Sequence, residues 1–266
     1  MIFTRLLNNI LAQFGLRLIL KRTLIPAAVL RDYRSHLEQL RRNPGRFSAI
    51  YEWPRFEAFE TGGHPSSYGD FDCEFAARCI KKYNPKSVLD VGSYRKFLFG
   101  LLARGPVTTL DVRSRQSGLE NERVVTGDAK ALPFPDNSFD AVVSLCALEC
   151  FGLGRYGDDF DPEADVTAFR EMVRVLKVGG VLILSTTITK SQPAIAFNTI
   201  RLYTNKMIHS LADGLRLMDE AFYSHKLDRA CSFDEVMTAT AKQWDVQALC
   251  WRKVAKTTPS HVTQRN

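Results

Sequence analysis

Short apolar segments alternate with segments of helical periodicity from residue 70 to the C-terminal region of this 266-residue chain. Short β-branched, apolar runs are typical of buried strands, and apolar residues spaced three and four apart are typical of helices. We expect strands at residues 87–91, 107–112, 123–126, 139–145, 181–188, 215–223 and 245–251. Helices are expected at residues 70–83, 93–103, 164–176, 198–211 and 233–242. The alternation predicts an α/β fold with a doubly wound, mostly parallel sheet of seven strands. We expect one of the last two strands to run antiparallel at the edge of that sheet.

The charge distribution divides the chain into three parts. Residues 1–55 contain ten Lys or Arg and three acidic residues, whereas residues 56–251 contain 22 basic and 26 acidic residues. We expect a basic, amphipathic helical extension with an aromatic loop at 1–68, a folded domain at 69–252 and a basic, disordered tail at 253–266. Because the folded domain is mildly acidic, the sequence does not favour nucleic acid as a partner.

The first residues have the pattern of an amphipathic helix. Apolar residues recur three and four apart between Ile2 and Phe14, with Arg5 and Arg17 beside them. This pattern is typical of a helix that lies on an anionic membrane surface, and it predicts a peripheral membrane contact through residues 1–24. The same apolar stripe also suits docking on the protein's own core or on a partner subunit, and the sequence does not decide between these alternatives.

A second amphipathic helix is expected at 27–42, followed by an aromatic, Gly/Pro-rich connector at 47–68 that forms either a linker or a lid. No apolar run reaches the roughly 18 residues that a membrane-spanning helix needs. Six cysteines are present and none forms a Cys-x-x-Cys pair. We therefore expect reduced thiols and a cytoplasmic protein, placed at the inner face of the membrane if the first helix binds there.

Polar residues stand at the carboxyl ends of the expected strands, where open α/β sheets bind their ligands. Asp111 follows Asp90 by 21 residues, close to the roughly 20-residue step at which an acid binds ribose hydroxyls in nucleoside-binding sheets. A dinucleotide fingerprint would require glycines where this chain has Tyr94 and Phe97. These two side chains disfavour a nicotinamide or flavin dinucleotide, whereas a nucleoside without phosphates is less demanding.

Five sequence strings together resemble the class I S-adenosylmethionine-dependent methyltransferases. They are Val88–Gly92 (VLDVG), Leu110–Val112 (LDV), Gly127–Ala129 (GDA), Leu132–Asp140 (LPFPDNSFD) and Arg174–Gly180 (RVLKVGG). The resemblance covers residues 70–251 and implies a Rossmann-like methyltransferase sheet with S-adenosyl-L-methionine as the cofactor. The GLGRYGD loop at Gly152–Asp158 is more narrowly similar to an uncharacterised bacterial methyltransferase-like family. Members of that group resemble enzymes of surface-polysaccharide and glycoconjugate pathways, which implies a substrate neighbourhood rather than a substrate.

The resemblance assigns nine positions to cofactor binding. They are Asp90, Gly92, Ser93, Tyr94, Asp111, Val112, Asp128, Ala129 and Leu145. It implies that Asp90 and Gly92 bind the methionine end of the cofactor and that Ser93 and Tyr94 form the turn beneath it. Asp111 would accept hydrogen bonds from the ribose hydroxyls, and Val112 would pack on the adenine. Asp128 and the Ala129 amide would bind the adenine edge, with Leu145 as the floor.

Tyr94 departs from the family pattern because it replaces the second glycine of the motif, and Arg95 and Lys96 follow it. The two basic side chains would either pair with the methionine carboxylate or crowd the pocket and repel the sulfonium. Both alternatives stay open at the level of sequence.

Methyl transfer from a sulfonium is an in-line displacement that depends on alignment and requires no metal ion. A base within hydrogen-bond reach helps when the acceptor is a hydroxyl. By position the candidate catalytic residues are Glu149, Tyr156 and Asp158, with Asp159 and His209 as further candidates. Each has a structural alternative: Glu149 as a helix cap or a partner of Arg155, Tyr156 as packing in a turn, and Asp158 as part of a solvated loop.

The sequence therefore predicts an enzyme, an S-adenosylmethionine-dependent methyltransferase that acts on an oxygen or nitrogen of a small-molecule or glycan-like acceptor. The alternative is a non-catalytic protein that binds the nucleoside and serves as a scaffold at the membrane surface. A nicotinamide-dependent oxidoreductase is disfavoured by Tyr94 and Phe97. Neither the acceptor nor the oligomeric state follows from the sequence.

Overall fold

The computed structural model describes residues 26–43, 45, 50, 52, 67–239 and 244–255. The chain divides into two compact units, Met1–Gly62 and Gly63–Asn266. Within the first unit, helix α2 spans Ala27–Arg42, as the periodicity predicts, and follows Pro26. The predicted amphipathic helix at 1–24, most of the aromatic connector and most of the basic tail lie outside the described residues.

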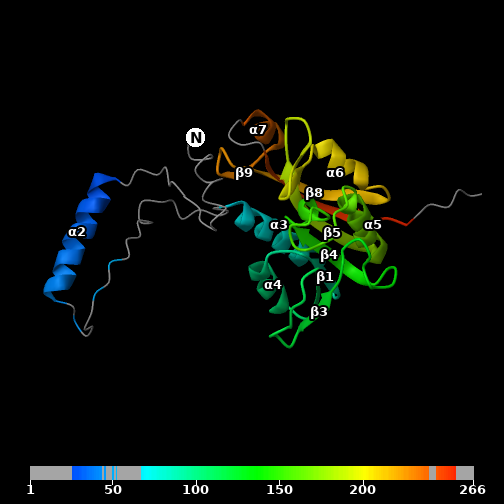
Figure 1. Ribbon diagram of the computed structural model, residues 1–266, viewed down its shortest axis with the longest axis horizontal. Coiled ribbons are helices and arrows are strands. Elements are labelled where there is room, and N and C mark those ends of the chain that lie inside the picture. The colour runs from blue at the N-terminus through cyan, green and yellow to red at the C-terminus, as the bar shows by residue number, and fades with distance from the viewer. Residues whose placement is uncertain are drawn as a thin grey trace, which may run out of the picture. The chain divides into compact units, whose positions relative to one another are not determined.

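The second unit is built on one large twisted sheet (Figure 1). Its strands are β1 (Val88–Val91), β2 (Val107–Asp111), β3 (Glu122–Thr126), β4 (Phe139–Leu145), β5 (Leu176–Ile188), β8 (Leu215–Ser224), β9 (Arg229–Cys231) and β10 (Asp245–Lys253). The spatial order is β3-β2-β1-β4-β5-β10-β8-β9, and strands β1 to β5 run parallel. The doubly wound α/β prediction is confirmed.

Two expectations about the sheet are wrong. The sheet has eight strands rather than seven, because the chain turns after Ser224 and returns along β8 as the three-residue strand β9. The antiparallel strand β10 lies inside the sheet, paired with both β5 and β8, rather than at its edge. Its burial on both faces along seven consecutive residues accounts for that interior position.

The helices of this unit are α3 (Tyr68–Tyr83), α4 (Arg95–Leu102), α5 (Ala164–Val175), α6 (Asn205–Leu211) and α7 (Phe233–Thr238), with a short 3-10 turn η1 (Leu148–Cys150). A separate hairpin is formed by β6 (Ala194–Ala196) and β7 (Ile200–Leu202). It replaces the first part of the helix expected at 198–211. The helix α6 begins later because the Thr204 side chain accepts a hydrogen bond from the Met207 amide and caps it.

Helix α5 ends at Val175 and β5 begins directly at Leu176, so Gly179 and Gly180 lie within the strand. A Cβ at Gly180 would lie 2.8 Å from the Asp140 carbonyl oxygen. This glycine therefore permits the close approach of β5 to β4 near the register shift between Phe139 and Ala141. Close backbone approach is the ordinary reason for glycine within a strand.

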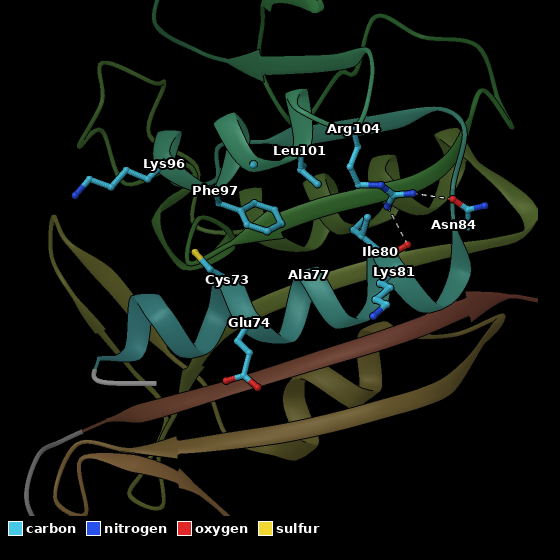
Figure 2. A pocket seen from close by; sticks show the side chains of 11 residues that line it. Cys73, Glu74, Ala77, Ile80, Lys81, Asn84, Lys96, Phe97, Leu101 and Arg104 are labelled. Atoms are coloured by element: carbon cyan, nitrogen blue, oxygen red, sulfur yellow. Dashed lines mark hydrogen bonds between the residues drawn. The ribbon is translucent and has the colours of Figure 1, made fainter. Parts of the chain in front are cut away.

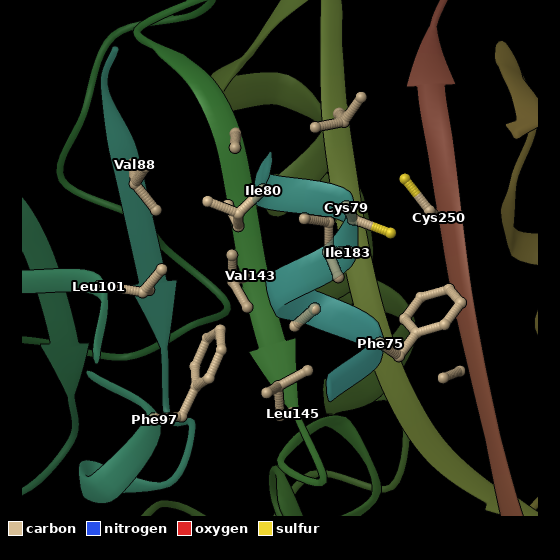
Figure 3. Close-up of a cluster of buried hydrophobic side chains, with 14 of the residues drawn as sticks. Phe75, Cys79, Ile80, Val88, Phe97, Leu101, Val143, Leu145, Ile183 and Cys250 are labelled. Carbon is tan, nitrogen blue, oxygen red and sulfur yellow. The ribbon is translucent and has the colours of Figure 1, made fainter. Parts of the chain in front are cut away.

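Two apolar cores hold the sheet between helices. The pleat directs alternate side chains to opposite faces, so Val88 packs with α3 and α4 whereas Leu89 packs with α5. Figure 3 shows the first core, in which Phe75 and Ile80 of α3 point toward the strands. The two faces together fix the carboxyl ends of the parallel strands, where loops are free to form a site. None of the helices in the described part of the chain is long and apolar enough to cross a membrane.

Candidate functional site

A cavity lies at the carboxyl ends of β1, β2, β3 and β4. It is lined by Val91, Gly92, Leu110, Asp111, Val112, Arg113, Gly127, Asp128, Ala129, Cys146, Ala147, Phe151, Gly152, Tyr156 and Asp158. The chain leaves β1 toward β2 on one side and crosses back to β4 on the other, so the cavity lies at the point where strand order reverses. Ligands of open α/β sheets bind at such a point.

Gly92 gives the cavity a floor of bare backbone. Its φ is +73°, and an added Cβ would lie 3.1 Å from the Cβ of Ala147. Its amide donates a hydrogen bond to the Leu110 carbonyl (3.2 Å), which ties the turn after β1 to β2. A side chain here would be strained by the backbone conformation and would crowd the neighbouring loop.

Asp90 is buried directly before this turn, and burial raises the pKa of its carboxyl to about 7. Within the described residues its Oδ1 has no hydrogen-bond partner. The neighbouring Ser93 hydroxyl accepts a hydrogen bond from the Leu145 amide (3.0 Å), which joins the turn to the end of β4. A buried, unsatisfied carboxylate oxygen beside a ligand cavity is a place where a ligand donor is expected.

The carboxylate of Asp111 is bound on both oxygens by Arg113. The Arg113 Nε and Nη2 donate over 2.9 Å and 2.8 Å, and the Arg113 amide adds a third hydrogen bond of 2.9 Å. Burial opposes ionisation, but the hydrogen bonds from Arg113 lower the pKa of Asp111 below its ordinary value. The ring of Tyr156 faces the Arg113 guanidinium at 4.6 Å. The expected ribose acceptor is therefore covered by its own neighbour.

Asp128 and Ala129 lie in the loop after β3 and line the same cavity, together with Val112. The Asp128 carboxylate accepts a hydrogen bond from the Lys130 amide (2.8 Å). The Lys130 ammonium lies 3.5 Å from both Asp128 and Asp161. Of the nine expected cofactor residues, the structure brings Gly92, Asp111, Val112, Asp128 and Ala129 to one cavity, with Asp90 and Ser93 in an adjoining hollow.

Leu145 and Tyr94 lie elsewhere. Leu145 is buried in the core beneath α3 (Figure 3), and Cys146 and Ala147 line the cavity in its place. The Tyr94 side chain packs against the same core, and its hydroxyl donates a hydrogen bond to Asp72 beside Cys146. Tyr94 therefore does not line the cavity, because its side chain is directed to the α3 side of the sheet.

Neither basic residue that follows Tyr94 lines this cavity. Arg95 pairs with the buried Glu122, at 3.1 Å between Nη1 and Oε1. Lys96 borders a separate groove of about 790 Å³ between α3 and α4, where Figure 2 shows it pointing away from that groove's apolar lining. One end of the groove is held by Arg104, which donates to the Ile80 carbonyl and to Asn84. This groove lies between two helices rather than at the strand ends.

The three candidate catalytic residues occupy different environments. Glu149 is buried in η1 and accepts a hydrogen bond from the Thr186 hydroxyl (2.9 Å), and burial raises the pKa of its carboxyl to about 7. Tyr156 is 38% exposed and lines the cavity mouth. Asp158 accepts hydrogen bonds from the amides of Gly152 (2.6 Å) and Tyr156 (3.1 Å), so it organises the loop between them.

The further candidates do not join this cavity. His209 lies on α6, where its Nε2 is 2.8 Å from a carboxylate oxygen of Glu220. Asp159 is exposed next to the cavity loop. Arg155, the expected partner of Glu149, donates to the Thr199 carbonyl instead (3.3 Å). In the described part of the chain no group of three His, Cys, Asp or Glu side chains is placed to hold a metal ion.

Arg201 supports the GLGRYGD loop from below. Its guanidinium donates to the carbonyls of Phe151 (2.5 Å), Asp161 (3.2 Å) and Pro162 (3.0 Å), and its Nε lies 3.4 Å from Asp165. Carbonyl groups on both sides of the loop are thus fixed by one buried side chain. The loop and β7, separated by about forty residues in the chain, form one support for the cavity wall.

Sequence reasoning missed the polar groups on the α3 side of the site. Asp72 is completely buried, and its Oδ2 lies 3.0 Å from the Cys146 sulfur. A signal was available, because Asp72 lies on the apolar face of the predicted helix with Phe75, Ala76 and Cys79 at spacings of three, four and seven. An acid on the buried face of an amphipathic helix requires a local reason.

Residues 89–184 match the family described as a methyltransferase domain. Over this segment the chain is similar to a methyltransferase domain, as the sequence strings predict. Demethylmenaquinone methyltransferase of Staphylococcus epidermidis is 38% identical over 117 residues, covering 41% of this chain and 40% of that protein. A malonyl-acyl carrier protein O-methyltransferase of Halorhodospira halophila is 27% identical over 163 residues, covering 55% and 52%. The chain spans about half or less of the length of these curated relatives.

Solved structures show the same fold. A 1,6-didemethyltoxoflavin N1-methyltransferase of Burkholderia thailandensis, solved with that compound and S-adenosylhomocysteine, has a TM-score of 0.53 at 16% identity and covers 89% of this chain and 94% of its own. The cyclase SpnF has a TM-score of 0.53 at 20% identity and covers 74% and 86%. Since a cyclase and a methyltransferase share this fold, the reaction must be argued from the site.

Proposed function

We propose that this chain binds S-adenosylmethionine in the cavity at the ends of β1, β2, β3 and β4 and transfers its methyl group to an oxygen or nitrogen of a small-molecule acceptor. One observation carries the proposal. The segment that matches the methyltransferase family, residues 89–184, contributes every residue that lines this cavity, including the bare-backbone floor at Gly92 and the carboxylates of Asp111 and Asp128.

The residues present fit this cofactor. Asp111 and Asp128 offer carboxylate oxygens to ribose hydroxyls and to the adenine amine, and Val112 and Ala129 offer apolar surface to the base. The unpartnered Asp90 oxygen offers an acceptor to the amino group at the methionine end. When bound, the cofactor supplies a methyl group on a sulfonium, and alignment of the acceptor with that group accounts for most of the acceleration.

The remaining roles fall to residues of the loop after β4. Ala147 and Phe151 line the cavity with carbon and exclude water from it. Glu149 is proposed as the group that takes the acceptor's proton. It lies in η1, between the cavity-lining residues Ala147 and Phe151, and burial raises the pKa of its carboxyl to about 7, which suits a general base at neutral pH. Tyr156 is proposed to cover the cavity mouth. Asp158 is proposed to hold the loop in the conformation that places Tyr156 there.

The narrower proposal for the acceptor is a glycan-like molecule. Phe160 and Phe197 are 67% and 74% exposed, and their rings meet edge to face at 6.1 Å beside the cavity loop. Exposed aromatic rings next to a pocket are typical of a binding surface. The curated relatives are named for demethylmenaquinone and malonyl-acyl carrier protein. A panel of sugar, quinone and acyl-thioester acceptors separates these classes, and transfer only to a quinone or a thioester would contradict the glycan-like proposal.

Calorimetric titration with S-adenosylmethionine and S-adenosylhomocysteine tests the cofactor proposal. We expect micromolar binding of both ligands, and we expect Asp111→Ala to lose it. Asp159→Ala should retain it, because Asp159 is an exposed acid directly after the GLGRYGD loop. Absence of binding by the unsubstituted protein would refute the proposal. Binding without transfer to any acceptor class would instead support the second candidate below.

The second candidate is a non-catalytic scaffold that binds the nucleoside. The position of Glu149 favours it, because this carboxyl is bonded to Thr186 and is not among the residues that line the cavity. In this form of the proposal residues 1–24 attach the protein to an anionic membrane surface. Deletion of residues 1–24 should then abolish sedimentation with phosphatidylglycerol vesicles and leave nucleoside binding unchanged. Equal sedimentation of the deleted and full chains would exclude the membrane contact.

A further inference from the structure

A buried polar cluster lies beside the cofactor cavity, on its α3 side. We define the Asp72 cluster as Asp72, Cys146, Tyr94 and Ser185. Asp72 is completely buried, its Oδ2 lies 3.0 Å from the Cys146 sulfur, and its Oδ1 has no hydrogen-bond partner among the described residues. No Lys, Arg or His side chain in the described part of the chain forms an ion pair with it. Burying a carboxylate without a cation costs free energy, so a carboxyl in this position is expected to have a specific role.

Cys146 connects this carboxyl to the cavity. It follows β4 with a φ of +49°, a left-handed conformation that few non-glycine residues adopt. Its amide donates to the carbonyl (3.0 Å) and hydroxyl (3.1 Å) oxygens of Ser185, which fix that conformation. The residue lines the cofactor cavity while its thiol donates to Asp72. Asp72 therefore meets the cavity through one side chain.

The groups that face Asp72 are neutral or acidic. From α3 itself comes Tyr68, and the centroid of its ring lies 5.5 Å from that of the His225 ring. The Tyr94 hydroxyl donates to Asp72 from the turn after β1, and Glu149 acts on it from η1. Burial is the largest effect, and it raises the pKa of Asp72 to about 7 despite the hydrogen bonds from Cys146, Ser185 and Tyr94.

We propose that Asp72, acting through Cys146, is a positioning residue that distinguishes the positively charged cofactor from its neutral thioether product. The inference rests on the proposed function. A sulfonium in the cavity attracts the carboxylate form of Asp72, whereas a thioether has no charge to attract it. Binding of the cofactor then releases a proton from Asp72, and conversion to product allows the proton to return. The site would hold the cofactor more tightly than its product above neutral pH.

Calorimetric titration of the full chain with S-adenosylmethionine and S-adenosylhomocysteine between pH 6 and pH 8 tests this inference. Both ligands have the same amino and carboxyl groups, so the ratio of their affinities isolates the sulfonium. We expect the ratio to rise in favour of the cofactor by roughly threefold to tenfold across neutral pH, because a cation binds the deprotonated form more tightly. Titration in two buffers of different ionisation enthalpy should show more proton release with the cofactor than with the product.

Variants assign the effect to one side chain. In Asp72→Asn the ratio should become independent of pH, and in Glu74→Gln, an exposed acid two residues along the same helix, it should follow the unsubstituted protein. Glu149→Gln should retain the pH dependence. Loss of the dependence in Glu149→Gln together with its survival in Asp72→Asn would overturn the inference.

The outcomes separate this inference from the function on which it rests. Binding of neither ligand refutes both. Binding of both ligands with a constant affinity ratio and equal proton release overturns the inference alone. Burial also raises the pKa of Asp90 and of Glu149 to about 7, so proton release by the unsubstituted protein does not by itself identify Asp72. If Asp72→Asn does not fold, Cys146→Ala, which removes the thiol that contacts Asp72, should abolish the difference in proton release between the two ligands. Persistence of that difference in Cys146→Ala would overturn the inference.

Discussion

At the residue scale, the side chain of Arg113 restricts access to Asp111. Its guanidinium covers both Asp111 oxygens and packs on Tyr156, and the cavity retains a volume of only about 80 Å³. Pockets that bury small ligands usually measure roughly 300–1,000 Å³. A nucleoside therefore has to displace this side chain before its ribose can reach Asp111.

Arg113→Ala should bind S-adenosylhomocysteine roughly threefold to tenfold more tightly, because it removes a competitor for the two oxygens that the ribose needs. Titration calorimetry measures the change. Arg104→Ala is the matched control, since Arg104 contacts Ile80 and Asn84 between the helices. Weaker binding by Arg113→Ala would mean that Arg113 contacts the ligand rather than competing with it.

Glu122 is a second residue whose effect depends on charge. It is buried beside the adjoining hollow and bonded to Arg115, Arg95 and Ser117, and these hydrogen bonds hold the pKa of its carboxyl near 2. Its folded-state pKa lies below the ordinary value near 4.5, so its contribution to stability is complete above about pH 4.5 and is lost as the pH falls toward 2.

Glu122→Gln should lower the free energy of unfolding at pH 7 by about 2 kcal/mol, less than a fully buried pair because Arg95 is half exposed. Urea unfolding at pH 7 and pH 3 measures the change, and the difference between variant and unsubstituted protein should shrink at pH 3. Glu120→Gln, an exposed acid just before the same strand, should leave both values unchanged. A constant difference at the two pH values would show that the loss comes from packing rather than from charge.

At the element scale, the strands that could be predicted from the sequence are those formed by a single short apolar run. The strands β1, β2 and β4 begin and end within one or two residues of their expected bounds, because short apolar runs bounded by Gly, Pro or Asp leave few alternatives. The strands β9 and β6 could not be predicted. Three-residue pairings of this kind are fixed by tertiary contact, and their sequences show no alternation of their own.

The residues of the candidate site likewise divide into those that could be predicted from the sequence and those that could not. Residues at strand ends, such as Gly92 and Asp111, could be placed from the sequence because parallel strands bring their carboxyl ends to one edge. The position of Asp72 on the buried face of its helix could be recognised from the sequence, but its partner could not be predicted, because nothing in α3 indicates which side chain after β4 it will meet. The hydrogen bonds from Arg113 to Asp111 were also missed, because these residues are two apart in the chain and meet only through the turn after β2.

The contact between the GLGRYGD loop and β7 can be tested through Arg201, which is 5% exposed. Arg201→Ala should lower the free energy of unfolding by about 3 kcal/mol, because it leaves Asp165 buried without its cation. It should also weaken nucleoside binding, since Phe151 would lose the bond that fixes the cavity wall. Chemical unfolding and titration calorimetry measure the two effects.

Arg155→Ala is the control for this substitution, because Arg155 lies in the same loop but is exposed, and it donates a hydrogen bond to the carbonyl of Thr199, next to β7. We expect it to change stability by less than about 1 kcal/mol. If Arg201→Ala destabilised the protein without changing the affinity for S-adenosylhomocysteine, the loop would not depend on β7 for its binding geometry.

At the scale of the whole molecule, the second unit, Gly63–Asn266, contains both apolar cores and the entire cofactor cavity. We expect a fragment that begins at Gly63 to melt within about 2 °C of the full chain and to bind S-adenosylhomocysteine with the same affinity. A fragment that begins at Asn84 should not fold, because it lacks α3 and exposes the core that Phe71 and Phe75 cover.

Thermal unfolding followed by circular dichroism decides between the two uses of the basic extension that the sequence left open. A contribution of 1 kcal/mol corresponds to roughly 2–4 °C in a domain of this size. A fall of 5 °C or more on removing the first 62 residues would therefore mean that the extension packs on the folded domain. An unchanged melting temperature leaves its apolar stripe free for another surface, and the vesicle experiment with residues 1–24 deleted then tests whether that surface is a membrane.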